Sequence, residues 1–524
     1  MTETHTWGSE IVPVTVSGVH YRMYSARPHR LGSLLELAGR WGDRPHIVQG
    51  ENIMSFDDFR DAVYVRAREL SSAGIGSGDR VVLLGFNSSA WIVNFWATVA
   101  VGGVSVLANA WWSDEELKDS LEIVGPTAVL ADEKIAPRVP TRYAVLPWTT
   151  DSDADGANRA PVSDTGTSEE DPAVVIFTSG TSGKPKGVVL SHRSLLAGLQ
   201  MLLHITRRLP HQVEDTAGEA ALHTGPMFHV GGVQTLLRAI CVGDTLVMPA
   251  GRFDAAEAMR LVEQWKIKRW SAVPTMVNRV LDHPDAQTRD LTTLKAVTVG
   301  GAPINAEFLE RLRNGLPGVE PRIATGYGLT ENGGQAVAAS GKDTVKHPGT
   351  TGRALPCVDV SIAPRPDLPD GEILLRSPTQ MLGYLGGVES PIDDEGWLHT
   401  GDLGHLDENG YLWITGRSKD MIIRGGENIS PAAVEAALIR LPEIRDAVVF
   451  GLPHPDLGEE VVAVVVLSHP LDPASFGPRL KGVIASFAIP TRWVVAEEDF
   501  PTNHAGKVDK NAVVAQARPE AVSQ

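Results

Sequence analysis

The chain has 524 residues and a formal net charge of −17 at pH 7. This acidic balance argues against a nucleic-acid partner held by a general basic surface, although a local basic patch is compatible with it. The chain has only two cysteines, Cys241 and Cys357, and no Cys/His cluster with the spacing of a zinc site. Neither a disulfide framework nor a structural zinc is therefore predicted.

The first residues have no basic segment followed by an apolar one, so they do not resemble a secretory signal. No uninterrupted apolar run reaches membrane-spanning length. We therefore expect a cytoplasmic protein with no membrane span, and its oligomeric state is left open.

Strand-like and helix-like patterns alternate through the first three quarters of the chain. Residues 80–85 read as a buried strand, 90–101 as an apolar helix and 105–107 as the next strand. This alternation predicts an α/β fold with largely parallel sheets. Residues 149–172 are rich in Asp, Ser, Thr, Gly and Pro, which predicts a surface connection.

The composition of the next segment suits a polyphosphate ligand. A short apolar strand, residues 173–177, is followed by Thr178-Ser179-Gly180-Thr181-Ser182-Gly183-Lys184-Pro185-Lys186-Gly187. Glycine lets backbone N–H groups approach anionic oxygens, hydroxyls donate hydrogen bonds, and Lys184 and Lys186 add positive charge. The run is not a Walker A loop, because Thr178 stands where that loop has glycine and Pro185 follows the lysine. The alternative is a polar surface turn.

A second unit is predicted to begin near Asp420. Before it, residues 405–407 and 411–414 form a hairpin pattern around a turn at 408–410. After it come a strand at 421–423, a helix at 430–441 and a strand at 446–450, arranged like a βαβ unit. Ser430 and Pro431 suit the N-cap and the first position of that helix.

Six motifs in chain order resemble those of the adenylate-forming superfamily, which contains acyl- and aryl-CoA synthetases, peptide-synthetase adenylation domains and firefly-type luciferases. The first is the phosphate loop above. The others are Gly300-Gly301-Ala302-Pro303, Thr325-Gly326-Tyr327-Gly328-Leu329-Thr330-Glu331, Trp397-Leu398-His399-Thr400-Gly401-Asp402-Leu403-Gly404, Gly416-Arg417-Ser418-Lys419-Asp420 with Gly425-Gly426-Glu427-Asn428-Ile429, and Pro501-Thr502-Asn503-His504-Ala505-Gly506-Lys507-Val508-Asp509-Lys510.

The resemblance implies an α/β fold with a large N-terminal domain of layered sheets and helices and a small mobile α+β C-terminal domain. It places the ATP- and acid-binding domain at residues 1–419 and the mobile domain at 420–524, with Asp420 as the hinge. It also implies ATP and Mg²⁺ as cofactors and a small carboxylic acid as substrate. The acid attacks the α-phosphate, and since both reactants are anions, catalysis depends on charge neutralisation and alignment.

The resemblance assigns roles on the ATP side of the site. Lys507 would be the catalytic cation, Thr330 would contact the α-phosphate, and Glu331 with Thr181 would hold Mg²⁺. Tyr327 would stack on adenine, and Asp402 with Arg417 would bind the ribose hydroxyls. The full ATP-binding set is Thr178, Ser179, Gly180, Thr181, Gly183, Lys184, Lys186, Gly301, Ala302, Pro303, Tyr327, Asp402 and Arg417.

Each of these assignments has a structural alternative. Glu331 suits helix capping, Asp402 a Gly-Asp turn, and Tyr327 a hydrophobic core. Lys507 alone would be a solvated charge, and Lys510 is expected to be one.

The acyl pocket is implied by resemblance to include His229, which would position the acid or gate access to it. The whole set is His229, Val230, Gly231, Val273, Gly300, Gly326, Gly333 and Gly334. Because most of these are glycine, we expect volume for a bulky or long apolar acid. No Asp stands near the start of the His229 region, which disfavours an α-amino acid substrate.

Three alternatives remain open for the function. Arg424, Gly425 and Gly426 suit a channel for a pantetheine arm, which favours an acid–CoA ligase. An amide ligase of the same fold would use an amine instead, and a non-catalytic relative would only bind the adenylate. The chain departs from the family at Ala433 and at Ala110-Trp111-Trp112.

Overall fold

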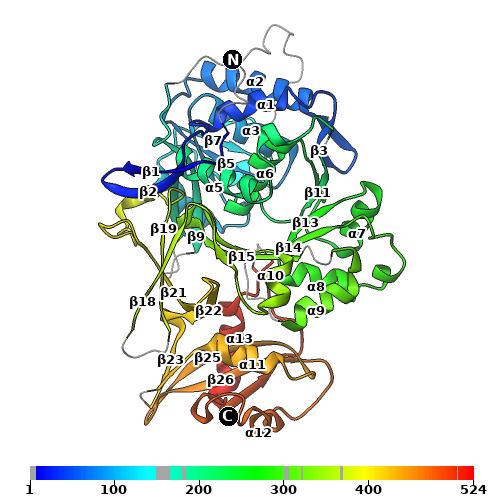
Figure 1. Ribbon diagram of the computed structural model, residues 1–524, viewed down its shortest axis with the longest axis vertical. Helices are drawn as coiled ribbons and strands as arrows, with labels where there is room; N and C mark the ends of the chain where they lie inside the picture. The colour runs from blue at the N-terminus through cyan, green and yellow to red at the C-terminus, as the bar shows by residue number, and fades with distance from the viewer. Residues whose placement is uncertain are drawn as a thin grey trace.

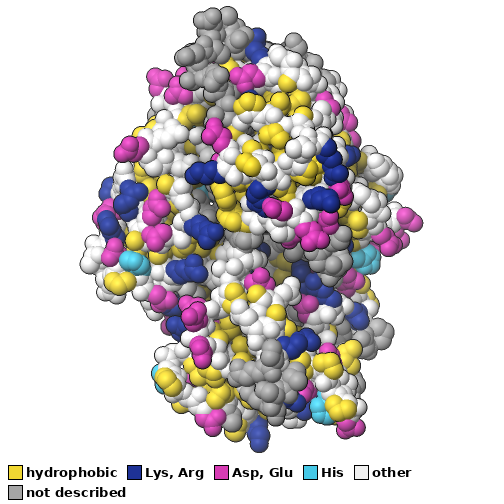
Figure 2. All heavy atoms as spheres, turned by 180° about the vertical axis from the view of Figure 1, so that it is seen from behind, with side chains coloured by type: hydrophobic (Ala, Val, Ile, Leu, Met, Phe, Trp, Pro, Cys, Tyr) yellow, Lys and Arg dark blue, Asp and Glu magenta, His cyan; other side chains and the backbone are white. Residues whose placement is uncertain are grey.

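The computed structural model describes residues 7–148, 166–179, 185–216, 218–299, 306–319, 323–365, 370–425, 427–503 and 506–523. In Figure 1 the N-terminal elements lie at one end of the molecule, and the elements that follow Asp420 lie at the other. None of the described helices has both the length and the apolar character needed to cross a bilayer. Figure 2 shows basic and acidic side chains interspersed over the opposite face.

The first large sheet confirms the predicted α/β order. Its seven strands run in the order β20-β10-β9-β6-β5-β7-β8, and β9, β6, β5, β7 and β8 pair in parallel. The strands are β5 (Arg80–Leu84), β6 (Val104–Leu107), β7 (Ala128–Ala131), β8 (Val145–Leu146), β9 (Pro172–Ser179), β10 (Pro185–Ser191) and β20 (Gly383–Tyr384).

The second large sheet has nine strands in the order β17-β16-β15-β14-β13-β11-β12-β3-β4. They are β3 (Pro45–Gln49), β4 (Asn52–Ser55), β11 (Ala220–His223), β12 (Thr245–Met248), β13 (Arg269–Ala272), β14 (Ala296–Val299), β15 (Ile323–Leu329), β16 (Gly334–Ala339) and β17 (Arg353–Ala354). Parallel pairing from β3 to β15 gives way to an antiparallel β15–β16 hairpin at one edge.

Helices cover these sheets, and their start signals are local. Ser55, Ser113 and Ser191 each form a reciprocal capping box at a helix start. The helices are α1 (Leu35–Ala38), α2 (Phe56–Ser72), α3 (Ser89–Ala100), α4 (Asp114–Val124), α5 (His192–Ile205), α6 (Val230–Val242), α7 (Ala255–Gln264), α8 (Pro274–Asp282), α9 (Ala306–Gly315) and α10 (Gly341–Lys346). The largest apolar core joins α3, α5 and α6 to both sheets. Cys241 and Cys357 are buried and free.

Two smaller sheets complete the part of the chain before Asp420. A hairpin joins β1 (Ile11–Val16) to β2 (Val19–Tyr24), and a four-stranded sheet has the order β18-β19-β21-β22. Its strands are β18 (Asp359–Ala363), β19 (Gly371–Arg376), β21 (Leu398–Leu406) and β22 (Leu412–Arg417). Leu406 pairs with Leu412, so the predicted hairpin is confirmed.

The elements after Asp420 form a separate sheet with its own core. They are β23 (Ile422–Arg424), β24 (Glu427–Ile429), α11 (Pro431–Ile439), β25 (Ile444–His454), β26 (Gly458–Leu467), α12 (Phe476–Leu480), β27 (Arg492–Val495) and α13 (Lys510–Ser523). Ser430 caps α11 with Pro431 at its first position, as predicted. The βαβ-like pattern needs one correction, because β26 lies between β23 and β25 and is antiparallel to both.

The side chain of Lys510 is exposed, as expected for a surface charge, and it also forms an ion pair. Its Nζ lies 2.6 Å and 2.7 Å from the two carboxylate oxygens of Glu435, which is itself buried. Glu435 also accepts the N–H of Val449. Lys510 is therefore a surface charge that also anchors the start of α13 to Glu435.

Candidate active site

Strands β9 and β10 pair as a hairpin, and this pairing includes the described ends of the predicted phosphate loop. Thr178 pairs with Lys186 across the two strands. The Lys186 ammonium lies 5.1 Å from the ring centroid of Tyr384, on the neighbouring strand β20. Gly180, Thr181, Gly183 and Lys184 lie outside the described residues, as do Gly300, Gly301, Ala302 and Pro303. The side chain of Ser179 is likewise not described.

Thr330 and Glu331 lie in a 3₁₀ turn, Thr330–Asn332, directly after β15. The Tyr384 hydroxyl donates a hydrogen bond of 2.9 Å to Glu331 Oε1. A single carboxylate fits Mg²⁺, which is commonly held by one or two carboxylates together with substrate phosphates. Among the described residues no group of three or more His, Cys, Asp or Glu side chains could form an all-protein metal cage.

Three residues predicted for the nucleoside side meet in one cluster, in which Tyr327 and Asp402 are buried and Arg417 is exposed. The Tyr327 hydroxyl donates to Asp402 Oδ2 at 2.6 Å, and Arg417 Nε donates to Asp402 Oδ1 at 2.6 Å. Asp402 is only 4% exposed. Burial and the Asp402 charge raise the pKa of Tyr327 well above its usual value, so the phenol stays protonated and donates.

Elements distant in sequence build this cluster. Tyr327 comes from β15, while Asp402 and Arg417 face each other across β21 and β22. The carboxylate is thus oriented before any ligand binds. Its predicted role toward a ribose, and stacking of Tyr327 on adenine, stay predictions.

The loop that carries Lys507 is a tight turn. Asn503 N–H donates to the Lys507 carbonyl at 2.7 Å, and Lys507 N–H donates to Asn503 Oδ1 at 3.1 Å. Gly506 has a φ of 76°, a left-handed conformation that favours glycine.

This turn is docked on the start of α8. The Thr275 hydroxyl donates to the carbonyl of Gly506. A Cβ at Gly506 would lie 3.1 Å from Met276 Cε and 3.2 Å from Val273 Cγ2. Burial, with a contribution from the nearby Arg417 cation, lowers the pKa of Lys507. The structure therefore places Lys507 near enough to Arg417 for the two charges to interact.

An aromatic series leads to His229, which precedes α6. Ring centroids are 5.3 Å apart for Phe86 and Trp111, 5.6 Å for Trp111 and Phe228, and 4.7 Å for Phe228 and His229. Phe86 is 42% exposed and Phe228 only 4%, so the series runs from the surface inward. Val230 begins α6, and Gly231 beside it is exposed.

The glycines of the predicted acyl pocket do not all leave open volume. A Cβ at Gly326 would clash with Gln335, one at Gly333 with the Thr379 carbonyl, and one at Gly334 with Gln234. These glycines permit close packing of protein groups, so the volume argument is corrected at all three positions. At Gly231, by contrast, no described atom lies within 4 Å of the Cβ position.

The predicted thiol channel makes its contacts within the unit after Asp420. Arg424 Nη1 donates to the Phe487 carbonyl at 2.6 Å, and Gly425 N–H donates to Leu457 at 2.7 Å. Gly426 lies outside the described residues. Asp420 ends a short 3₁₀ turn, Ser418–Asp420, between β22 and β23.

Sequence reasoning missed Tyr384 and Gln234. Gln234 Nε2 donates to the Gly333 carbonyl at 3.0 Å, and Gln234 follows Val230 by one helical turn, so helical periodicity could have placed it at the pocket. Tyr384 lies 53 positions from Glu331, and no local spacing connects the two.

Comparison with known proteins agrees with this geometry. Residues 34–385 match the family model described as AMP-binding enzyme, and residues 433–507 match the AMP-binding enzyme C-terminal domain. The chain is 32% identical to 3-[(3aS,4S,7aS)-7a-methyl-1,5-dioxo-octahydro-1H-inden-4-yl]propanoyl:CoA ligase of Rhodococcus jostii (strain RHA1), over 93% of this chain and 98% of the relative.

Two further relatives extend the comparison. Feruloyl-CoA synthase of an Amycolatopsis species is 30% identical over 90% of this chain and 96% of that protein. The crystal structure of ATP-bound MatB from Rhodopseudomonas palustris has a TM-score of 0.80 and 27% identity, and covers 93% of this chain and 99% of that chain.

Proposed function

We propose that this chain, which belongs to the AMP-binding enzyme family and is an ATP-dependent, AMP-forming carboxylic acid ligase, joins a bulky or long hydrophobic acid to CoA. The observation that carries the proposal is the docked lysine turn. Lys507 belongs to the unit after Asp420, yet its turn rests on α8 beside Arg417. A cation delivered there suits the first half-reaction, in which two anions must meet.

In that half-reaction a carboxylate oxygen of the acid would attack the α-phosphorus of ATP. The bond to pyrophosphate breaks, and an acyl adenylate forms. Lys507 would stabilise the negative charge that develops between the two reactants, with Thr330 nearby. Asp402, oriented by Tyr327 and Arg417, would accept hydrogen bonds from the ribose hydroxyls.

The phosphate side would be held by the β9–β10 hairpin and Glu331. Lys186 adds positive charge, and Glu331 with Thr181 would hold Mg²⁺. When bound, Mg²⁺ supplies charge neutralisation on the phosphates.

The acid would lie near His229, Val230 and Gly231, with Val273 on the side of the lysine turn. The named substrates of two relatives are a bicyclic propanoyl group and a feruloyl group. Both have bulky carbon skeletons, which supports a bulky or long hydrophobic acid here.

In the second half-reaction the thiol of CoA would attack the acyl carbonyl, AMP would leave, and the thiol proton would pass to solvent. We propose that residues 420–524 rotate as a domain against residues 1–419, with Asp420 as hinge. Lys507 would leave the site, and Arg424, Gly425 and Gly426 would line the path of the pantetheine arm.

The test has two parts. Exchange of label between pyrophosphate and ATP should require a suitable acid from a panel of hydrophobic carboxylic acids, and release of ADP alone would overturn the AMP-forming mechanism. Each accepted acid is then given CoA or an amine. A thioester product supports the proposal, whereas an amide product without thioester would make the chain an amide ligase. Absence of exchange with every acid would favour a non-catalytic relative.

A further inference from the structure

We propose that Tyr384 is a positioning residue that fixes the carboxylate of Glu331 relative to the phosphate-side hairpin. The inference rests on the proposed role of Glu331 as the Mg²⁺ ligand. Tyr384 contacts both Glu331 and Lys186, two residues assigned to the phosphate side. Its hydroxyl donates to Glu331 Oε1 at 2.9 Å, and the ammonium of Lys186 lies 5.1 Å from its ring centroid.

The backbone of Tyr384 is fixed to the hairpin. Strand β20 pairs antiparallel with β10, so that Tyr384 lies opposite Val188 and Gly383 opposite Val189. One residue earlier, Leu382 N–H donates to the Val189 carbonyl at 2.8 Å. The tyrosine therefore moves with the strand that follows the phosphate loop.

The segment just before Tyr384 is also hydrogen-bonded to the turn that carries Glu331. Met381 N–H donates to the Glu331 carbonyl at 2.9 Å. Asn332, next to Glu331, accepts the Ser377 hydroxyl at 2.9 Å through its side-chain oxygen. Residues 377–384 thus connect the turn that carries Glu331 to the phosphate-side hairpin.

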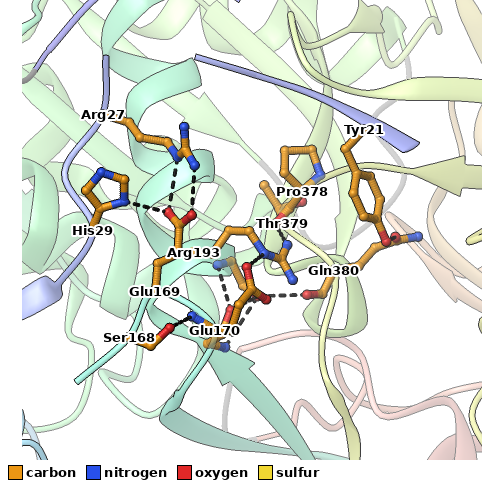
Figure 3. Close-up of polar contacts among 12 residues, drawn as sticks. Tyr21, Arg27, His29, Ser168, Glu169, Glu170, Arg193, Pro378, Thr379 and Gln380 are labelled. Atoms are coloured by element: carbon orange, nitrogen blue, oxygen red, sulfur yellow. Dashed lines mark hydrogen bonds and ion pairs between the residues drawn. The ribbon is translucent and has the colours of Figure 1, made fainter. Parts of the chain in front are cut away.

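A buried arginine, Arg193, anchors the same segment to the start of α5. Arg193 donates to Glu170 Oε1 at 2.8 Å and also to the Pro378 carbonyl, and its side chain is 5% exposed. Figure 3 shows Arg193 between Glu170 and Pro378, with Gln380 beside Tyr21. The Ser194 hydroxyl donates to the Gln380 carbonyl at 2.7 Å. These bonds hold the chain rigid where it reaches Tyr384.

The phenol is suited to hold one carboxylate oxygen without competing for a cation. The Tyr384 hydroxyl is a neutral donor, and it donates to Oε1 of Glu331. A bond to Oε1 orients the carboxylate and presents Oε2 for a hard cation. Partners of this kind outside the ligand set typically affect metal affinity about 10–100-fold.

Tyr411 provides a matched control away from the site. Its hydroxyl donates to Asp343 Oδ1 at 2.7 Å, and the Arg353 guanidinium lies 4.8 Å from its ring centroid. It therefore makes the same two kinds of contact as Tyr384, although Tyr411 is buried and Tyr384 is half-buried. Tyr411→Phe tests what the loss of such a hydroxyl does in general.

The experiment compares Tyr384→Phe, Tyr384→Leu, Tyr411→Phe and Glu331→Gln in the full chain. In pyrophosphate–ATP exchange, Tyr384→Phe should raise the half-saturating Mg²⁺ concentration about tenfold or more. The effect should lie mainly in this concentration rather than in kcat at saturating Mg²⁺. Glu331→Gln should raise this concentration at least as much. A double variant that combines Tyr384→Phe with Glu331→Gln should shift it little further than Glu331→Gln alone. Tyr411→Phe should leave it as in the parent.

A second readout needs neither metal nor turnover. Calorimetric binding of ATP in EDTA should be similar for Tyr384→Phe and the parent, because the ring beneath Lys186 remains. Tyr384→Leu should weaken this binding several-fold, because Lys186 would lose the aromatic ring that helps to hold its ammonium in place.

Two outcomes would overturn the inference while leaving the proposed function intact. One is a Mg²⁺ shift in Glu331→Gln with none in Tyr384→Phe. The other is an equal loss of metal-free ATP binding and of thermal stability in Tyr384→Phe, which would show a general structural role. If Glu331→Gln itself left the Mg²⁺ dependence unchanged, the role of Glu331 and the inference would both fail.

Discussion

At the residue scale, Lys507 has a charge that the ligand-free site does not favour. Burial and Arg417 lower its pKa, and an anion bound beside the lysine would favour its charged form. The phosphates and the carboxylate of the acid would supply one. Binding of ATP and docking of the lysine turn should therefore reinforce each other.

Lys507→Ala should lower adenylation about 10²–10³-fold, because one charge-stabilising donor is lost. Thioester formation from a supplied acyl adenylate should be nearly normal, since the lysine would have left the site by then. The two half-reactions are measured separately, by pyrophosphate–ATP exchange and by consumption of the adenylate with CoA. Lys510→Ala is the control for the loss of a nearby lysine that contacts Glu435 and has no proposed role in the reaction. Equal losses in both half-reactions would instead show misfolding.

Gly231 is the position at which added volume should change acid preference. A leucine there would enter the open space beside His229 without a left-handed backbone to strain it. Gly231→Leu should shift kcat/KM toward smaller acids by about tenfold or more, since one methylene in an apolar pocket is worth about 10–200-fold. The KM for ATP should change little.

Gly334→Leu is the contrasting variant for this measurement. Gly334 has a φ of 115°, and a Cβ there would clash with Gln234. This change should destabilise the protein rather than alter its preference. Unchanged acid preference in a folded Gly231→Leu enzyme would show that the acid lies elsewhere.

At the element scale, the third residue of β25, Asp446, is a carboxylate in an environment that disfavours its charge. Burial raises the pKa of Asp446 from 3.8 to about 6, and the nearby Glu435 charge adds to the effect although the Ala447 N–H opposes it. Because the folded-state pKa is raised, the folded chain binds the proton more tightly than the unfolded chain. Stability should thus fall as pH rises from about 4 through about 6, and the loss should persist at neutral pH.

Asp446→Asn should therefore stabilise the protein at about pH 7.5, by about 1–2 kcal/mol after allowance for partial solvent screening. Asn can still accept the Ala447 N–H, as Asp446 Oδ1 does at 2.9 Å. The stability advantage of Asp446→Asn over the parent should shrink as pH is lowered to about 5, where the folded aspartate is protonated. Urea unfolding of both proteins at each pH measures it, with the exposed Asp456→Asn as control. A constant difference across this range would contradict the raised pKa.

The elements that could be predicted from sequence are those with local signals. The strand at 80–85, the Ser430-Pro431 helix start and the hairpin around 408–410 each depend on neighbouring residues alone. The bond between Tyr327 and Asp402 joins positions 75 apart, and no periodicity encodes it. At Gly334 the chain position was found, but the identity of the group beside it, Gln234, depends on how α6 packs against β16. The resemblance supplied those site residues that local patterns could not.

At the scale of the whole molecule, two segments of the last unit are candidates for the same site. The Lys507 turn is docked on α8, while Arg424 and Gly425 bond within their own unit. Both cannot occupy one site in one arrangement, so the proposed reaction needs a rotation. Asp420, at the end of the turn Ser418–Asp420, is where we place it.

Asp420→Pro should trap the arrangement seen here. Proline fixes φ near −65°, which lies within the range of a 3₁₀ turn, and it therefore restricts the backbone change that a second arrangement would need. Pyrophosphate–ATP exchange should be largely retained, while transfer to CoA should fall at least about tenfold because the rotation then limits turnover. Asp420→Ala, which keeps backbone freedom, should retain both activities.

An amide ligase makes a different forecast, since an amine could reach the adenylate without rotation and product formation would survive the proline. Pyrophosphate release and final product are therefore measured separately, with CoA and with amines. Normal transfer to CoA by Asp420→Pro would show that rotation about this residue is not part of the mechanism.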